Sequence, residues 1–97
     1  MIKHVVFFKF KPDATPHDRQ SALDELRSLP AKIDVIREFE IGEDLVRSPR
    51  SWDAVLIATY DDLEWLQTYQ RHDAHVPVVQ RLQSLCEAIA SVDFETA

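Results

Sequence analysis

Residues 2–10 have the sequence IKHVVFFKF, in which β-branched and aromatic residues dominate. This composition is typical of a β-strand. Successive side chains of a strand point to opposite faces, so Val6 and Phe8 share one face while Val5 and Phe7 share the other. Both faces are therefore apolar. We expect this strand to lie in the interior of a sheet that is covered on both sides.

Three further segments have strand-like sequences. Residues 52–60, WDAVLIATY, are apolar on both faces and predict a second central strand. Residues 34–42 and 89–95 instead alternate apolar and charged side chains, which is typical of edge strands with one exposed face.

The last of these strands has a defined expected orientation. We expect Val92 and Phe94 to face the core, and Asp93 and Glu95 to face solvent.

Helices are predicted between the strands. Thr15 can accept a hydrogen bond as the N-cap of a helix that starts at Pro16 and runs to about Leu29, where Pro30 stops it. Its inward face is predicted to carry four apolar residues, Ala22, Leu23, Leu26 and Leu29.

The second half of the chain predicts two helical stretches. Asp61 or Asp62 can cap the first, with Leu63, Leu66 and Tyr69 facing inward. Asp73 can cap the second, whose apolar face is formed by Val78, Val79, Leu82, Leu85 and Cys86.

The resulting order, strand–helix–strand–strand–helix–strand, predicts an α+β fold of the ferredoxin-like βαββαβ type. Right-handed crossovers give a four-stranded antiparallel sheet in the order 4-1-3-2 with helices on one face. The 97 residues fit a single domain, 1–97. The other face of the sheet would expose an apolar patch, so we expect the chain to form a homodimer through it.

Composition excludes several classes of partner. The formal net charge is −6, whereas nucleic acids and anionic membrane surfaces attract clustered Lys and Arg. We therefore expect no nucleic-acid partner and no membrane partner. Cys86 is the only cysteine, and the chain runs from Met1 straight into a strand without a signal peptide, which together predict a cytoplasmic protein.

The residues Tyr69-Gln70-Arg71-His72-Asp73-Ala74-His75 carry the most chemical information. They place a phenol and two imidazoles where one helix ends and the next begins. His75 lies near the positive end of a helix dipole, which keeps imidazole neutral and able to accept a proton. Tyr69 could bind a carbonyl oxygen, and His4 lies on the strand face that we assign to the helices. The same residues could equally close the turn by hydrogen bonds to the backbone.

His72 and His75 also have the i, i+3 spacing of a metal-binding pair. A structural zinc site usually has four protein ligands, and beside these two imidazoles the sequence offers no paired acid or Cys close by. The sequence therefore predicts no metal site and no cofactor.

The chain resembles the stress-responsive A/B barrel (Dabb) family of dimeric α+β barrels. The resemblance covers essentially the whole sequence and rests on five pieces: residues 4–11, Leu29-Pro30, residues 52–56, residues 69–75 and Val92-Asp93-Phe94. It implies a homodimer whose two sheets pack into a barrel, with larger assemblies in some plant members. Because some relatives bind a divalent ion near the dimer interface, it also leaves a Mg²⁺-type site open.

One plant branch of this family is a polyketide cyclase that performs an intramolecular aldol condensation. By this resemblance Tyr69 and His75 would be catalytic, and His4 would be a pocket histidine. We also expect His72 to contribute to ligand binding. The chain departs from the family pattern at two positions, of which the first weakens the cyclase analogy and the second changes the turn while supplying a helix cap. Ala54 stands where the cyclase has a further pocket histidine, and Asp73 stands where the family usually has proline.

Three functional hypotheses follow. The first is a His/Tyr pocket that binds a small oxygenated apolar molecule, with acid–base chemistry of the aldol or cyclase kind. The second is a non-catalytic, stress-associated oligomer. The third is a cofactor-free monooxygenase or isomerase of another dimeric barrel type.

Overall fold

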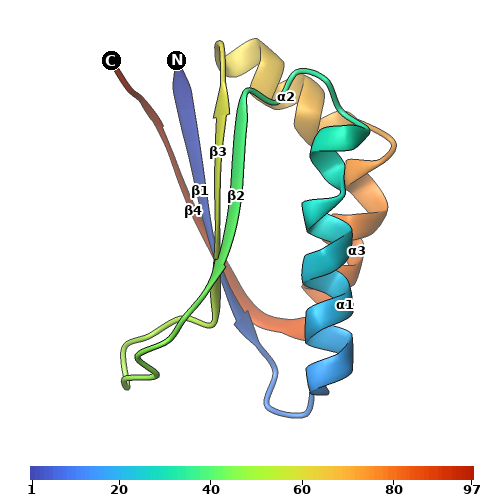
Figure 1. Cartoon of the computed structure of the whole chain (residues 1–97), viewed down its shortest axis with the longest axis vertical. Coiled ribbons are helices and arrows are strands. Elements are labelled where there is room, and N and C mark those ends of the chain that lie inside the picture. The colour runs from blue at the N-terminus through green and yellow to red at the C-terminus, as the bar shows by residue number, and fades with distance from the viewer.

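The computed structural model describes residues 1–97 as one sheet with one layer of helices beside it (Figure 1). The strands are β1 (Ile2–Phe10), β2 (Glu38–Glu43), β3 (Ala54–Tyr60) and β4 (Cys86–Glu95). The helices are α1 (Pro16–Arg27), the 3₁₀ turn η1 (Leu29–Ala31), α2 (Leu63–Arg71) and α3 (His75–Leu85). All of them lie on the same side of the sheet.

The strands pair in the order β2-β3-β1-β4, and every pair is antiparallel. This is the predicted order 4-1-3-2, and the ferredoxin-like fold is confirmed. The two strands that are apolar on both faces occupy the centre, and the two alternating strands occupy the edges. The chain ends also meet, because the Thr96 N–H donates to the Met1 carbonyl at 2.9 Å.

Helix starts follow the capping residues of the sequence in two of three cases. The Thr15 hydroxyl accepts from the Asp18 N–H at 3.1 Å, and the Asp62 carboxylate accepts from the Trp65 N–H at 3.0 Å. Each bond satisfies a backbone donor that the first helical turn leaves unpaired. At its other end, α1 stops at Arg27, and Pro30 lies inside η1.

The predicted cap of α3 was wrong. Ala74 occupies the N-cap position and Asp73 makes no cap hydrogen bond. Nδ1 of His72 accepts from the Ala74 N–H at 3.0 Å. This bond lies one residue before α3, so no side chain caps the first turn of that helix.

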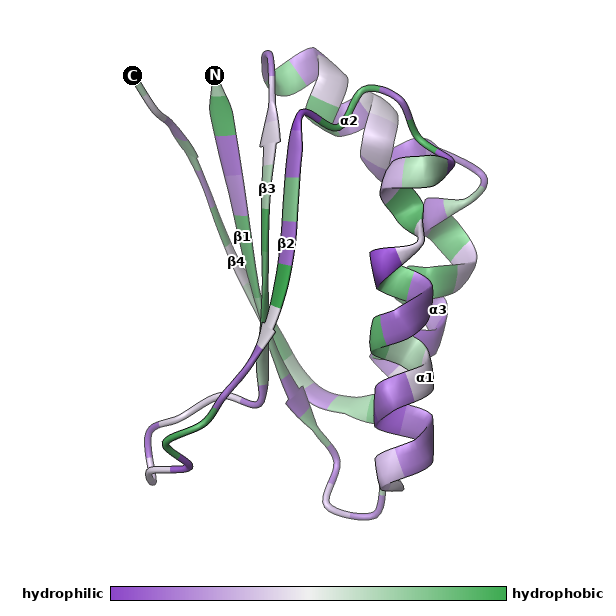
Figure 2. Ribbon diagram, in the orientation of Figure 1, coloured by the Kyte–Doolittle hydropathy of each residue, from purple (hydrophilic) through white to green (hydrophobic).

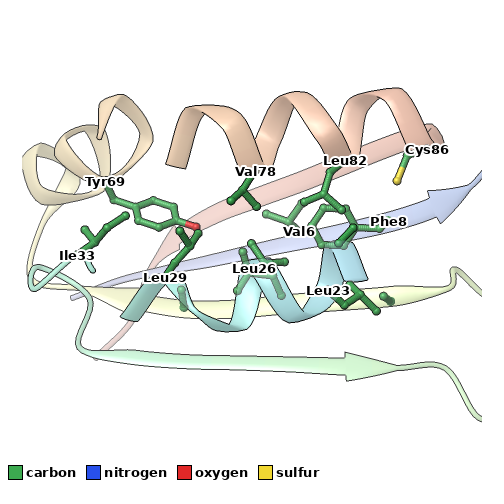
Figure 3. Close-up of a cluster of buried hydrophobic side chains, with 14 of the residues drawn as sticks. Val6, Phe8, Leu23, Leu26, Leu29, Ile33, Tyr69, Val78, Leu82 and Cys86 are labelled. Carbon is green, nitrogen blue, oxygen red and sulfur yellow. The ribbon is translucent and has the colours of Figure 1, made fainter. Parts of the chain in front are cut away.

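The core lies between the sheet and the helices, and its side chains are drawn in Figure 3. Figure 2 shows apolar segments on the strands and on the sides of the helices that face them. The four residues predicted to face inward from the first helix are all buried, although Leu29 belongs to η1: Ala22, Leu23, Leu26 and Leu29. Leu66 and Tyr69 are also buried as expected, but Leu63 is exposed. Cys86 is buried as expected, although it begins β4 and does not continue α3.

The orientation predicted for the end of β4 was also wrong. Asp93 lies opposite His4 and Val92 lies opposite Val5 in the β1–β4 pairing. Directly opposed residues of an antiparallel pair share a face, so Asp93 faces the helices. Val92 and Phe94 lie on the face that the helices leave uncovered.

We call this uncovered surface the open face. Its apolar side chains come from three strands: Val5, Phe7, Val55, Ile57, Ala90, Val92 and Phe94. Lys3 of β1 and Glu38 and Glu40 of β2 add charged side chains to the same face. The exposed fractions of Phe7, Phe94 and Val92 are 38%, 44% and 59%. Trp52 packs against Phe7, but no helix lies over this face (Figure 1).

The loop between β2 and β3 is held by an aspartate. Asp53 accepts from the Phe10 N–H at 2.8 Å and from the Arg47 guanidinium at 2.6 Å. Arg47 has φ of 54°, in the left-handed region that glycine prefers. Its ion pairs with Asp53 and Asp44 therefore offset local backbone strain.

No helix of the chain is both long and apolar enough to cross a bilayer.

Candidate functional site

Four aromatic rings meet between the sheet and the α2–α3 junction. We call them the ring cluster: His4 from β1, Tyr60 from β3, Tyr69 from α2 and His75 from α3. The ring centroids of Tyr69 lie 4.3 Å from His75 and 5.1 Å from Tyr60. The His4 ring lies edge-on to both tyrosines, with centroids 6.3 and 6.4 Å away. The structure thus brings together three residues that the sequence analysis singled out, and it adds Tyr60.

His4 is buried and paired with Asp93. Nδ1 of His4 donates a hydrogen bond to Oδ1 of Asp93 across the β1–β4 pairing. A carboxylate only accepts, so the proton lies on Nδ1. In the neutral imidazole, Nε2 is then an acceptor. The aspartate thereby fixes the orientation of the His4 ring.

The two tyrosines are fully buried, and each is 0% exposed. Neither hydroxyl has a hydrogen-bond partner of good geometry within the protein, although the two phenols lie close enough to influence each other's pKa. Figure 3 shows the Tyr69 phenol directed inward among Leu29 and Val78. Burial raises the pKa of both phenols well above the ordinary value, and the neighbouring Tyr69 raises that of Tyr60 further. Both phenols therefore stay protonated at physiological pH.

His75 is half-buried and is the first residue of α3. Its Nδ1 lies 3.0 Å from the Gln70 carbonyl oxygen, which can only accept, so Nδ1 carries the proton. Burial lowers the pKa of His75; the Gln70 carbonyl opposes this shift, and the charges of His4 and His72 add to it. His75 is therefore neutral near pH 7, with a lone pair on Nε2. That is the state a general base needs.

His72 is placed differently from the other candidates. Its Nδ1 accepts a hydrogen bond from the Ala74 N–H. His72 also lines a surface hollow beside α2, together with Glu64, Gln67, Thr68, Arg71 and Asp73. It makes none of the ring contacts of the cluster described above. Its connection to the site is electrostatic, through the effect of its charge on the pKa of His75.

No group of three or more His, Cys, Asp or Glu side chains is arranged to hold a metal ion. The divalent ion implied by the family resemblance therefore finds no ready set of ligands within one copy of the chain. The larger surface hollows are lined by residues outside the ring cluster. The cluster itself is closed, and His75 is its most accessible member.

Two residues of the site were missed by the sequence analysis. Asp93 was assigned to solvent because Val92 and Phe94 looked like the core-facing pair. Counting the register back from His4 would have corrected this, since an antiparallel neighbour of His4 shares its face. Tyr60 was predicted to lie in a strand, but it was not named as a site residue. It lies on the same buried face of β3 as Ala58 and Leu56.

The sequence matches the model of the Stress Responsive A/B Barrel Domain family over residues 2–96. The chain belongs to this family. Within it, the chain is 30% identical to a stress-response A/B barrel domain-containing protein of Arabidopsis thaliana. The match covers 97% of this chain and 36% of that protein, so the chain spans about a third of its relative's length.

Solved structures share the fold of this chain. A dimeric protein of unknown function with a ferredoxin-like fold, from Bacteroides fragilis, superposes with a TM-score of 0.82. It is 31% identical, with 98% of this chain and 95% of that chain covered. The hydroxynitrile lyase of Passiflora edulis superposes with a TM-score of 0.87 at 13% identity, over 96% of this chain and 90% of the lyase. At that identity the lyase shows a shared fold alone.

Proposed function

We propose that this A/B barrel protein is a homodimer whose ring cluster binds a small oxygenated apolar molecule and performs general acid–base chemistry on it. The observation that carries this proposal is the pair of buried hydroxyls, on Tyr60 and Tyr69, that have no partner in the protein. The acid–base part rests on His75, which is neutral and has a free Nε2.

Buried hydroxyls without partners are unusual in a core. An unsatisfied buried polar group costs about 1–3 kcal/mol, and nearly all such groups in native proteins are paired. Here two lie side by side, next to a histidine oriented by a carboxylate. Even if one phenol donated to the other, the second O–H would still lack an acceptor. Phenylalanine would fill the same space without that cost, whereas a ligand oxygen that accepts from the hydroxyls accounts for their presence.

The roles of the residues follow from their protonation. Nε2 of His75 accepts a proton from a carbon next to a carbonyl, and the electron pair of the broken C–H bond forms the enol double bond. The carbonyl oxygen, as it gains charge, accepts a hydrogen bond from the Tyr69 hydroxyl. His75 then returns its proton to carbon or oxygen. This is the proton-transfer step with which an aldol condensation begins.

The fold is compatible with such chemistry, since it houses a lyase in Passiflora edulis. Function on a shared fold depends on the residues of the site, so the lyase's reaction does not transfer to this chain. Ala54 also fills, with a methyl group, the place that we matched to a cyclase histidine, and it is buried. We therefore propose the reaction class and not a cyclase substrate.

The dimer part of the proposal rests on the open face. Three strands present apolar side chains there, and the related B. fragilis protein is described as dimeric. A second copy packed face to face would cover this surface. Stable interfaces bury at least about 1,000 Å² in total, which is within the reach of a four-stranded sheet.

Deuterium exchange tests the acid–base function directly. We would incubate the protein in D₂O with a β-keto ester and follow the loss of the α-proton signal by NMR. The wild type should accelerate the exchange above the protein-free rate, and His75→Gln should reduce it by about 100-fold or more. His17→Gln is the matched control, since it changes an exposed histidine of α1 and should leave the rate intact.

The closed state of the cluster favours a second candidate function, a non-catalytic stress-associated oligomer. His4, Tyr60 and Tyr69 are all buried, and no large hollow reaches them. If the wild type neither accelerates exchange nor shows NMR shifts near His75 with β-keto esters, the assembly function is the correct one.

A further inference from the structure

Tyr60 and Tyr69 reach the same place from different elements. Tyr60 ends β3, opposite Ile2 of β1, whereas Tyr69 lies in the last turns of α2. Their rings are 5.1 Å apart, and the His4 ring lies edge-on to each. Two neutral donors, both 0% exposed and both without partners, thus converge beside one imidazole.

We propose that Tyr60 and Tyr69 form a two-donor site for an oxyanion, and that the ligand is an enolisable carbonyl compound whose oxygen becomes negative there. This inference rests on the proposed function and adds Tyr60 to it as a second residue that touches the reacting atoms. It also specifies the ligand class, a molecule with an acidic C–H next to its carbonyl.

The physical reason is the strength of hydrogen bonds to charge. A hydrogen bond to a charged group is roughly twice as strong as one between neutral groups, and a low dielectric strengthens it further. Two phenols that remain protonated stabilise an enolate more than the ketone from which it forms. That difference is what accelerates a proton abstraction.

The charged groups near the ring cluster affect how well an anion would bind there. The charge of Asp93 disfavours ionisation of Tyr60 and would also repel an oxyanion. Asp93, however, already accepts a hydrogen bond from His4. The His75 ring lies tilted against the Tyr69 ring, with centroids 4.3 Å apart. From this position it can receive the proton that leaves the ligand carbon. The base His75 and the donor Tyr69 are therefore direct neighbours in the ring cluster.

The step balances without any other reactant. The C–H bond of the ligand breaks and its proton moves to Nε2 of His75. The C–H electron pair becomes the carbon–carbon double bond, and the carbonyl π electrons move to oxygen. Both phenols keep their protons and share them with the oxyanion.

Binding of 4-nitrophenolate tests the oxyanion site, because its absorbance reports the charged oxygen and nitrobenzene offers the same ring without it. We expect Tyr60→Phe and Tyr69→Phe each to weaken phenolate binding by about 10-fold or more, from the loss of one charged hydrogen bond. Nitrobenzene affinity should stay the same in both variants. Thr68→Val, which removes an exposed hydroxyl of α2, is the control and should change neither affinity.

The variants should fold, since each deletes only a hydroxyl that lacks a partner. Their melting temperatures should therefore equal or exceed that of the wild type. If Tyr60→Phe binds phenolate like the wild type while Tyr69→Phe does not, the two-donor site is wrong. The proposed function would survive that result, provided the wild type still accelerates deuterium exchange. If the wild type binds no phenolate at all, the oxyanion site is also excluded, and the exchange assay then decides the proposed function separately.

Discussion

At the scale of single residues, burying the His4 ring costs free energy unless Asp93 accepts its hydrogen bond. Asp93→Ala leaves Nδ1 of a buried imidazole without an acceptor, which should lower the free energy of unfolding by about 1–3 kcal/mol. Urea denaturation at pH 7 measures this. Glu95→Ala, two residues along the same strand and without a hydrogen bond, should change it by less than about 0.5 kcal/mol. Equal losses in both variants would show that the pair contributes nothing.

His75 makes stability depend on pH. Its folded pKa lies below the ordinary value, so the unfolded chain binds the proton more readily than the folded one. The stability that His75 contributes is complete above its unfolded pKa of about 6.5 and falls as the pH drops toward the lowered folded pKa.

We therefore expect wild-type stability to fall more steeply than that of His75→Gln between pH 7.5 and pH 5. Chemical denaturation at a series of pH values gives the difference between the two proteins, in which the common effect of the carboxylates cancels. Parallel curves would mean that the pKa of His75 is not lowered in the folded protein.

How much of the site could be predicted depended on whether its residues were neighbours in the sequence. Tyr69, His72 and His75 stand within one short segment, and His4 stands on a strand face that was correctly assigned. Asp93 and Tyr60 join the site only through strand register. Register is set by pairing partners far along the chain, and no local pattern reveals it.

At the scale of helices and strands, the order and type of every major element were predicted, because apolar periodicity is strong in each. The ends were less accurate. β4 begins at Cys86 and not near residue 89, since the α3 pattern runs on past the real helix end at Leu85. β2 begins only at Glu38, because the residues before it form turns. Helix and strand ends depend on tertiary pairing as well as on local sequence.

Asp53 connects β1 to the β2–β3 loop, and its substitution tests how that loop is held. It accepts from β1 through the Phe10 N–H and from the β2–β3 loop through Arg47. Burial tends to raise the pKa of Asp53, but the Arg47 and Phe10 hydrogen bonds outweigh it and the net shift is downward.

Asp53→Ala should lower the free energy of unfolding by about 1.5–3 kcal/mol and should mobilise residues 44–51. Urea titration and backbone amide exchange measure the two effects. Asp34→Ala removes an exposed aspartate without an ion pair and should be nearly neutral. A rigid loop in Asp53→Ala would contradict the role that we assign to this side chain.

At the scale of the whole molecule, the open face determines whether the protein forms a dimer. Val92→Lys places a charge on an exposed position of this face, and in a face-to-face dimer that charge would be buried without a partner. We expect the wild type to be dimeric and Val92→Lys to be monomeric by light scattering at micromolar concentration.

Leu63→Lys is the matched control for the dimer, because Leu63 is an exposed leucine on the helix side, with an exposed fraction of 57%. It should remain dimeric. A monomeric wild type, or a dimer in all three proteins, would show that the open face is not the interface.

The meeting of the chain ends has a consequence for protein engineering. Because Thr96 is hydrogen-bonded to Met1, a linker of a few residues could join them without disturbing β1 or β4. New ends could then open in the exposed tip at Leu45 and Val46, which lies between strands and outside the core. A circular permutant of this kind would keep every strand pairing while moving both termini away from the ring cluster. Fluorophores or a fused domain attached there would report on the site without standing in its way.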